Sequence, residues 1–147
     1  PVLASIGFSC TVVDDRAEFA DPALFPQAEA VYEADYEALP ADLGVTPDDY
    51  VCIMTRGHVG DYDVQRQMLA IKPYYLGVIG SRRKLAFVKE KLLADGFTAA
   101  EIDACHAPIG LAISAVTPAE IAISIAAELI AIRAKREGRE KSRYHKP

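Results

Sequence analysis

The chain has few cysteines, and their spacing excludes the usual metal and disulfide motifs. Cys10, Cys52 and Cys105 are its only three cysteines, and no two of them have the Cys-x-x-Cys spacing. An odd number of widely spaced thiols favours buried, reduced side chains over a disulfide framework or a zinc site. The sequence shows no signal peptide, and its longest apolar stretch, residues 121–132, is interrupted by polar residues and too short to span a bilayer. We therefore expect a cytoplasmic protein with no membrane partner.

A strongly basic composition is absent as well. The net charge is -5 and the pI is near 5.2, so nucleic acid is not an expected partner. Hydrophobic residues make up 51% of the 147 positions, which is enough for a folded core and excludes a disordered chain. With no internal repeat or low-complexity linker, this length predicts one Rossmann-like domain over residues 1–136 and a charged, disordered tail over residues 137–147.

Short, continuous apolar runs predict the strands of that domain. Such runs are typical of strands that helices cover on both faces of a parallel sheet, and they occur at residues 10–14, 50–54 and 75–79. Helical spacing of apolar side chains predicts helices near residues 63–71, 82–95, 98–104 and 121–135. Further signals indicate a helix at the start of the sequence that ends at Gly7, a short strand at 30–32 and a helical turn at 36–39. The alternation predicts an α/β fold with a Rossmann-like, doubly wound parallel sheet.

The first strand and glycine-rich turn with which a Rossmann domain begins are missing from this sequence. In a doubly wound sheet that strand is central, so its absence leaves a gap between the others. We expect sequence upstream of Pro1, or a swapped segment, to fill that place.

The last predicted helix has the strongest start signal. Residues 117–120, Thr-Pro-Ala-Glu, supply an N-cap hydroxyl, a proline at the first helical position and an acid three residues after the cap. We interpret Glu120 as this capping acid rather than as a catalytic residue. Apart from a polar line of Glu120, Ser124 and Glu128, the helix is apolar on nearly every face. That pattern predicts burial on more than one side and a homo-oligomer.

Polar loops follow the three main predicted strands, where ligands bind in sheets of this kind. Asp14 and Asp15 end the first strand. An acid in this place can hydrogen-bond a ribose hydroxyl of a dinucleotide. A solvated turn explains the two acids equally well.

The second loop consists of Thr55, Arg56, Gly57 and His58, with Asp61 just beyond it. Glycine permits a tight turn, arginine offers a planar donor fork for phosphate or carboxylate, and histidine transfers protons near neutral pH. A single histidine is often structural, but this combination at the end of a strand favours a functional site.

The third loop consists of Gly80, Ser81, Arg82, Arg83 and Lys84. It leads directly into a helix, so free backbone amides and the positive end of the helix point to one spot. Basic side chains there do not stabilise the helix, which favours an anion-binding site. In the alternative, the serine only caps the helix and the basic side chains face water.

A fourth candidate is the segment 106–111, His-Ala-Pro-Ile-Gly-Leu. A proline and a glycine so close together indicate a fixed loop. His106 could face the pocket or be structural, and the sequence does not separate the two.

Taken together, these segments resemble the xanthine dehydrogenase accessory factor family. The resemblance runs from Ile6 to about Arg133 and lies in five segments that occur in the family's order. They are residues 8–21, 54–61, 74–84, 106–111 and 117–128. The sequence departs from the family in lacking the upstream strand and its Gly-Ala-Gly-His-like turn.

The resemblance implies a protein that binds the molybdenum cofactor, molybdopterin, and assists its maturation and insertion into a xanthine-dehydrogenase-like molybdenum hydroxylase. Members of the family are described as protecting the cofactor during sulfuration and delivering it to the apoenzyme. The implied partners are therefore a cofactor sulfurase and the hydroxylase apoenzyme. Carried over by position, the implied binding elements are the two strand-end acids and the loops at 55–58 and 80–84.

Two other functions are compatible with the same fold. An oxidoreductase that uses NAD(P) or FAD would need a glycine fingerprint and an evident proton-transfer pair, and only His58 is available for the latter. A regulatory domain that senses a small molecule is a third interpretation. We favour a cofactor-binding chaperone over an enzyme.

Overall fold

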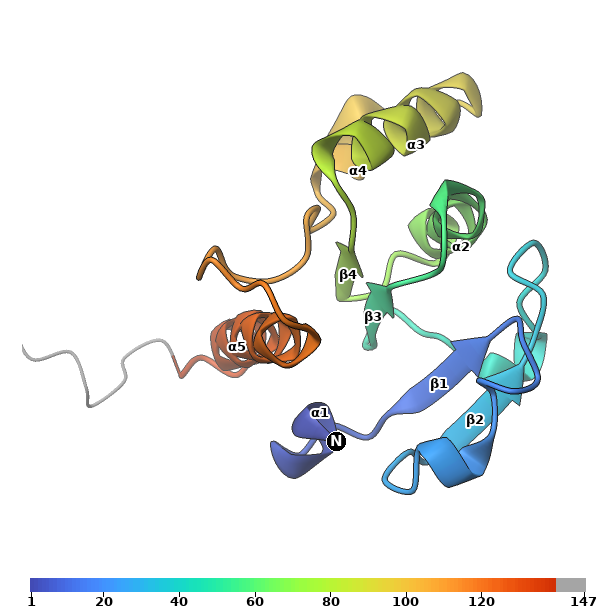
Figure 1. Ribbon diagram of the computed structural model, residues 1–147. Coiled ribbons are helices and arrows are strands. Elements are labelled where there is room, and N and C mark those ends of the chain that lie inside the picture. Colours follow the sequence, from blue (N-terminus) through green and yellow to red (C-terminus); the bar gives the residue numbers. More distant parts are fainter. Residues whose placement is uncertain (140–147) are drawn as a thin grey trace, which may run out of the picture. The chain divides into compact units, whose positions relative to one another are not determined.

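The computed structural model describes residues 1–139, which form two compact units. The first unit comprises Pro1 and residues 3–109, and the second comprises Val2 and the residues from Gly110 onward. The elements, labelled in Figure 1, are α1 (Val2–Ser5), β1 (Thr11–Asp14), β2 (Ala30–Glu33), β3 (Tyr50–Ile53), α2 (His58–Ile71), β4 (Tyr75–Val78), α3 (Arg82–Ala94), α4 (Ala99–Asp103) and α5 (Pro118–Arg136). Most of the predicted tail, residues 140–147, lies outside the described residues, and the prediction of one domain over residues 1–136 stays a prediction.

The strands pair in parallel, as the apolar runs predict. β1 pairs with β2, with Val12 opposite Val31, and β3 pairs with β4, with Ile53 opposite Val78. Within residues 1–139 these are two separate two-stranded sheets, and no described strand joins β1 to β3. The predicted α/β, Rossmann-like fold with parallel strands is confirmed.

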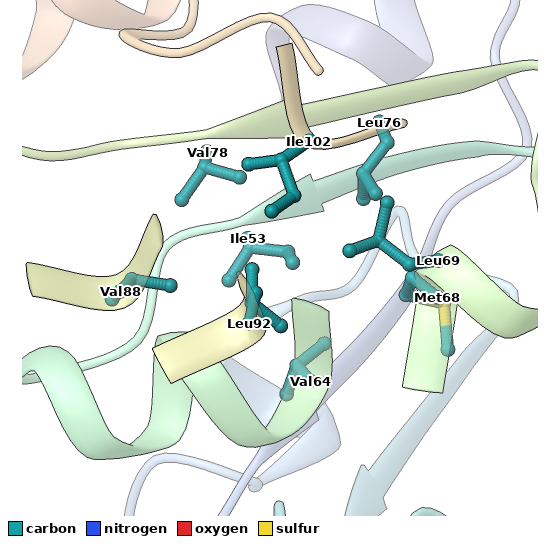
Figure 2. Packing of buried hydrophobic residues seen from close by; sticks show 9 residues of the cluster. All are labelled: Ile53, Val64, Met68, Leu69, Leu76, Val78, Val88, Leu92 and Ile102. Atoms are coloured by element: carbon teal, nitrogen blue, oxygen red, sulfur yellow. The ribbon is translucent and has the colours of Figure 1, made fainter. Parts of the chain in front are cut away.

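The core of the first unit lies between the β3–β4 sheet and three helices. Ile53 and Val78 are 2% and 0% exposed, and Leu92 of α3 is also fully buried. Burying a side chain of this size contributes about 1.5–3 kcal/mol. Figure 2 shows the whole cluster: Ile53, Val64, Met68, Leu69, Leu76, Val78, Val88, Leu92 and Ile102. This packing fixes α2 and α3, the helices that follow the second and third predicted site loops.

One prediction about local structure is wrong. The helix expected from about residue 63 already begins at His58, because Gly57 adopts φ 96° and turns the chain directly into it. The turn expected at 36–39 is a single hydrogen-bonded turn, in which the Ala38 amide donates to the Asp35 carbonyl at 3.3 Å. The Asp35 carboxylate also accepts from the Glu37 amide at 2.9 Å. His58 therefore belongs to the first turn of α2 and not to the loop.

The segment that begins at His106 extends the edge of β4. The His106 amide donates to the Leu76 carbonyl at 2.8 Å, and the Val78 amide donates to the His106 carbonyl at 3.0 Å. The His106 ring lies against Tyr75, with the ring centroids 4.6 Å apart. These contacts favour the structural interpretation of His106.

The start of α5 is the capping box that the sequence predicts. Thr117 Oγ1 accepts from the Glu120 amide at 3.3 Å, and Glu120 Oε2 accepts from the amides of Thr117 and Val116 at 2.8 Å each. The Thr117 and Val116 amides lower the pKa of the Glu120 carboxyl. The capping interpretation of Glu120 accounts for all of these bonds.

The rest of the polar line on α5 holds the loop that precedes it. Ser124 Oγ donates to the Leu111 carbonyl at 2.7 Å, and Glu128 Oε2 accepts from the Gly110 amide at 2.8 Å. The three residues of this polar line, Glu120, Ser124 and Glu128, thus form hydrogen bonds with backbone groups of residues 110–117. None of the helices in residues 1–139 is long and apolar enough to cross a bilayer.

Candidate functional site

The two predicted acids at the end of β1 have different partners. Asp14 accepts from the Arg16 guanidinium at 2.8 and 3.0 Å, and also from the Arg16 backbone amide at 3.1 Å. The Arg16 guanidinium, stacked 3.9 Å from the Phe19 ring centroid, holds the pKa of the Asp14 carboxyl below its ordinary value. Asp15 lies 3.6 Å from Arg16 Nε but is 48% exposed, and it lines a hollow beside the end of β2. Of the two acids, Asp15 is the more open to a ligand.

Tyr36 connects the β1 loop to the loop after β3. Its hydroxyl is hydrogen-bonded to the Asp15 backbone, and burial, with the nearby acids, raises its pKa. Its ring lies against Gly60 in α2, where a Cβ atom would come within 2.9 Å of both Tyr36 Cδ2 and Thr55 Oγ1. The absent side chain of Gly60 therefore allows Tyr36 and Thr55 to pack closely against the backbone of α2.

The Thr55–His58 segment has three exposed residues and one, Thr55, that is partly buried. Arg56, Gly57 and His58 are exposed. The His58 ring packs edge-on against Phe87 of α3, with the centroids 4.8 Å apart. Thr55 is partly buried and hydrogen-bonded to Asp61 of α2. This segment therefore lies beside α3, with an exposed guanidinium at its tip.

The basic residues after β4 are not equivalent. Ser81 caps α3 by accepting from the Lys84 amide at 3.3 Å. Helix geometry leaves the amides of Arg82 and Arg83 without an intrahelical acceptor, and both side chains are exposed. The Lys84 side chain is only 21% exposed, and its ammonium forms an ion pair with the buried Asp61 carboxylate. An anion at this helix start would meet two exposed guanidinium groups and two backbone amides, with Gly80 at the entry to the turn.

Asp61 contacts both the Thr55–His58 segment and the basic loop at residues 80–84. Its side chain is fully buried, at 0% exposure, in the first turns of α2. Oδ1 accepts from the Thr55 amide at 3.2 Å and from Thr55 Oγ1 at 2.5 Å, while Oδ2 forms an ion pair with Lys84 Nζ. One buried carboxylate thus fixes the end of β3 against the first turn of α3.

The set of site residues predicted from the sequence does not include Tyr36 or Asp61, the two residues whose contacts connect the loops. An acid six residues after Thr55 is visible in the sequence, but its partner Lys84 lies 23 positions further on, and only the fold brings them together. Lys84 is predicted as part of an anion site, and in the structure its ammonium forms an ion pair with Asp61.

All three cysteines are present as thiols. Burial raises the pKa of Cys105 and of Cys10, which makes both poor nucleophiles near neutral pH. Within residues 1–139, no group of three or more His, Cys, Asp or Glu side chains is arranged to hold a metal ion.

Comparison with known proteins identifies the family. Residues 1–129 match the model of the XdhC Rossmann domain. The chain is 33% identical over 131 residues to the uncharacterized protein YqeB of Escherichia coli, and 28% identical over 130 residues to a Bacillus subtilis protein named as a probable xanthine dehydrogenase subunit. Each match covers 88% of this chain. The chain therefore belongs to the XdhC Rossmann domain family, and the resemblance seen in its motifs is confirmed.

A solved structure agrees with this assignment. A xanthine dehydrogenase from Bacillus halodurans matches 99% of the chain with a TM-score of 0.72 and 30% sequence identity. The chain spans 24% of YqeB, 37% of the Bacillus subtilis protein and 40% of the Bacillus halodurans chain. It thus corresponds to one part of these longer relatives.

Proposed function

We propose that this chain binds the molybdenum cofactor and assists its maturation and insertion into a xanthine-dehydrogenase-like hydroxylase. The observation that carries the proposal is the convergence of three polar loops, each following a parallel strand, through contacts made by Tyr36 and Asp61. Membership of the XdhC Rossmann domain family supports it, as does the likeness to a protein named as a probable xanthine dehydrogenase subunit. The proposed partners are the hydroxylase apoenzyme and a cofactor sulfurase.

The side chains present suit the chemistry of such a ligand. The cofactor carries a phosphate, and the exposed guanidinium groups of Arg82, Arg83 and Arg56 are strong donors to phosphate. Asp15 can accept from the N–H groups of the pterin or from a ribose hydroxyl of a nucleotide form. The bound cofactor would supply the metal chemistry, while these residues would bind and orient it.

The double substitution Arg82→Ala/Arg83→Ala tests this proposal. We expect it to weaken binding of the molybdenum cofactor about tenfold or more, because each charge-assisted hydrogen bond contributes roughly 1.5–3 kcal/mol. Folding should hardly change, since removing positive charge from the first turn of a helix is neutral or mildly favourable. Calorimetric titration measures the affinity.

The matched control is Arg66→Ala/Lys91→Ala, which also removes two positive charges from exposed positions on α2 and α3, but outside the loop. It should leave the affinity close to that of the wild type. If both double variants bind the cofactor as the wild type does, Arg82 and Arg83 are ordinary surface charges and the phosphate of the cofactor binds elsewhere.

One observation favours a second candidate, an NAD(P)- or FAD-dependent oxidoreductase. The exposed carboxylate of Asp15 at the carboxyl end of β1 has the place from which an acid binds the ribose of a dinucleotide. Equilibrium dialysis with NAD, NADP and FAD separates the two candidates. Tight binding of a dinucleotide in competition with the molybdenum cofactor would favour the oxidoreductase.

We also propose self-association through α5. Ile123 and Ile130 lie seven positions apart, on the same face of the helix, and are 53% and 40% exposed. Apolar side chains in such a stripe favour contact with a second copy. The variant Ile123→Glu/Ile130→Glu should therefore convert an oligomer to a monomer in sedimentation experiments, whereas Leu24→Glu, which alters an apolar residue that is 55% exposed in the first unit, should not. A wild type that sediments as a monomer at all concentrations would contradict this proposal.

A further inference from the structure

Asp61 has a position that core packing does not explain. A carboxylate at 0% exposure carries a desolvation cost. A buried ion pair often contributes no more to the stability of the fold than two apolar side chains in the same place would. The other buried residues of α2 include Val64, Met68 and Leu69, which contribute by apolar burial alone. The ion pair of Asp61 with Lys84 therefore suggests a role beyond stability.

The contacts of Asp61 show what that role could be. Both loops that it joins leave the same edge of the sheet, because β3 and β4 are parallel and in register. Thr55, from the first loop, gives Asp61 two hydrogen bonds, at 3.2 and 2.5 Å. Lys84, from the second, is held at both ends, by the bond from its amide to Ser81 Oγ at 3.3 Å and by the ion pair of Nζ with Asp61.

A lysine ammonium has three donors, and the bond to Asp61 uses one of them. The Lys84 side chain runs back along the turn at the start of α3, where a Cβ atom on Gly80 would come within 3.2 Å of Lys84 Cδ, and it is 21% exposed. The exposed residues Arg82 and Arg83 precede it in the same helical turn. A ligand anion at the start of α3 is therefore within the reach of an ammonium whose position Asp61 has already fixed.

We infer that Asp61 is a positioning residue of the anion site: it sets Lys84 Nζ and the Thr55 loop in the geometry that receives the ligand's phosphate. This inference rests on the proposed function for the identity of the phosphate-bearing ligand. Fixing a long lysine side chain in advance reduces the conformational entropy that binding would otherwise cost. Asp61 itself need not touch the ligand.

The variant Asp61→Asn separates positioning from simple electrostatics. Asparagine can still accept from Thr55 through its carbonyl oxygen, but it cannot form an ion pair with Lys84. The change raises the net charge of the site by one unit. If charge alone governs binding, Asp61→Asn should bind an anion more tightly than the wild type. If Asp61 positions Lys84, it should bind more weakly despite the added positive charge.

The experiment uses inorganic pyrophosphate as the probe, titrated calorimetrically into the wild type, Asp61→Asn, Thr55→Val and Thr55→Ser. We expect Asp61→Asn to lose about tenfold in affinity and Thr55→Val to lose several-fold. Thr55→Ser, which keeps the hydroxyl, should restore the wild-type value. Thermal unfolding shows whether each variant is folded. If Asp61→Asn does not fold, Thr55→Val still tests the inference.

The outcomes also separate this inference from the proposed function. Equal or tighter binding of pyrophosphate by Asp61→Asn overturns the inference, and so does a wild type that does not bind pyrophosphate. In either case, binding of the molybdenum cofactor by the wild type leaves the proposed function standing. Weaker pyrophosphate binding by Asp61→Asn, together with a wild type that ignores the cofactor, supports the inference and contradicts the proposed function.

Discussion

Replacing Lys84 with methionine should lower the free energy of unfolding by about 3 kcal/mol, because it leaves a buried charge without its partner. Methionine keeps most of the aliphatic part of the side chain but removes the ammonium that balances the Asp61 carboxylate. The mean effect of an exposed substitution is much smaller, within about 0.5 kcal/mol. Urea unfolding, followed by circular dichroism, gives the difference from the shift of the midpoint.

Two further variants show whether the ion pair is the cause. Arg82→Met changes the neighbouring exposed cation in the same turn of α3 and should leave stability nearly unchanged. Asp61→Asn/Lys84→Met removes both charges and should recover much of the loss, since asparagine can still accept from Thr55. A double variant as unstable as the sum of the two single variants would show that the two side chains do not interact as described.

Replacing Gly110 with alanine should also have a large effect. Gly110 has φ +92°, which alanine adopts only at a cost of about 1–2 kcal/mol. The new Cβ atom would overlap Ser124 Oγ and lie 3.3 Å from the Ile125 backbone nitrogen in α5. The added overlap raises the expected loss to about 3 kcal/mol or more, and thermal unfolding measures it.

Gly96 provides the matched control for this substitution. Its φ is +95°, but a Cβ atom there would meet nothing within 4 Å. Gly96→Ala should therefore show the backbone cost alone, about 1–2 kcal/mol. Equal losses in the two variants would mean that the close packing of the loop against Ser124 adds nothing to stability.

The sequence predicted the elements whose signals are local. Each main strand is a continuous apolar run, and Thr117 with Glu120 is a complete capping pattern within four residues. The predicted strands and the start of α5 follow from these runs directly. The predicted start of α2 is wrong because it depends on the backbone angle of Gly57, φ 96°. The presence of a glycine does not by itself specify that angle.

The candidate site was predictable as a set of loops, but its internal contacts were not. The sequence places the polar residues at the carboxyl ends of the strands, and the parallel neighbours β3 and β4 bring the second and third loops to one edge of their sheet. It could not show that Arg16 occupies Asp14 or that Lys84 turns toward Asp61, because such contacts depend on side-chain directions in the folded protein. Ser124 and Glu128 on α5 are similar: both residues are visible in the sequence, but their backbone partners at Leu111 and Gly110 are not.

The most direct test of the proposed function is mass spectrometry of the small molecules released from the protein after purification from a host that makes molybdenum cofactor. We predict a phosphorylated pterin, or its nucleotide form, from the wild type, and much less of it from Arg82→Ala/Arg83→Ala. Release of NAD(P) or FAD in place of a pterin, equally from both proteins, would contradict the account.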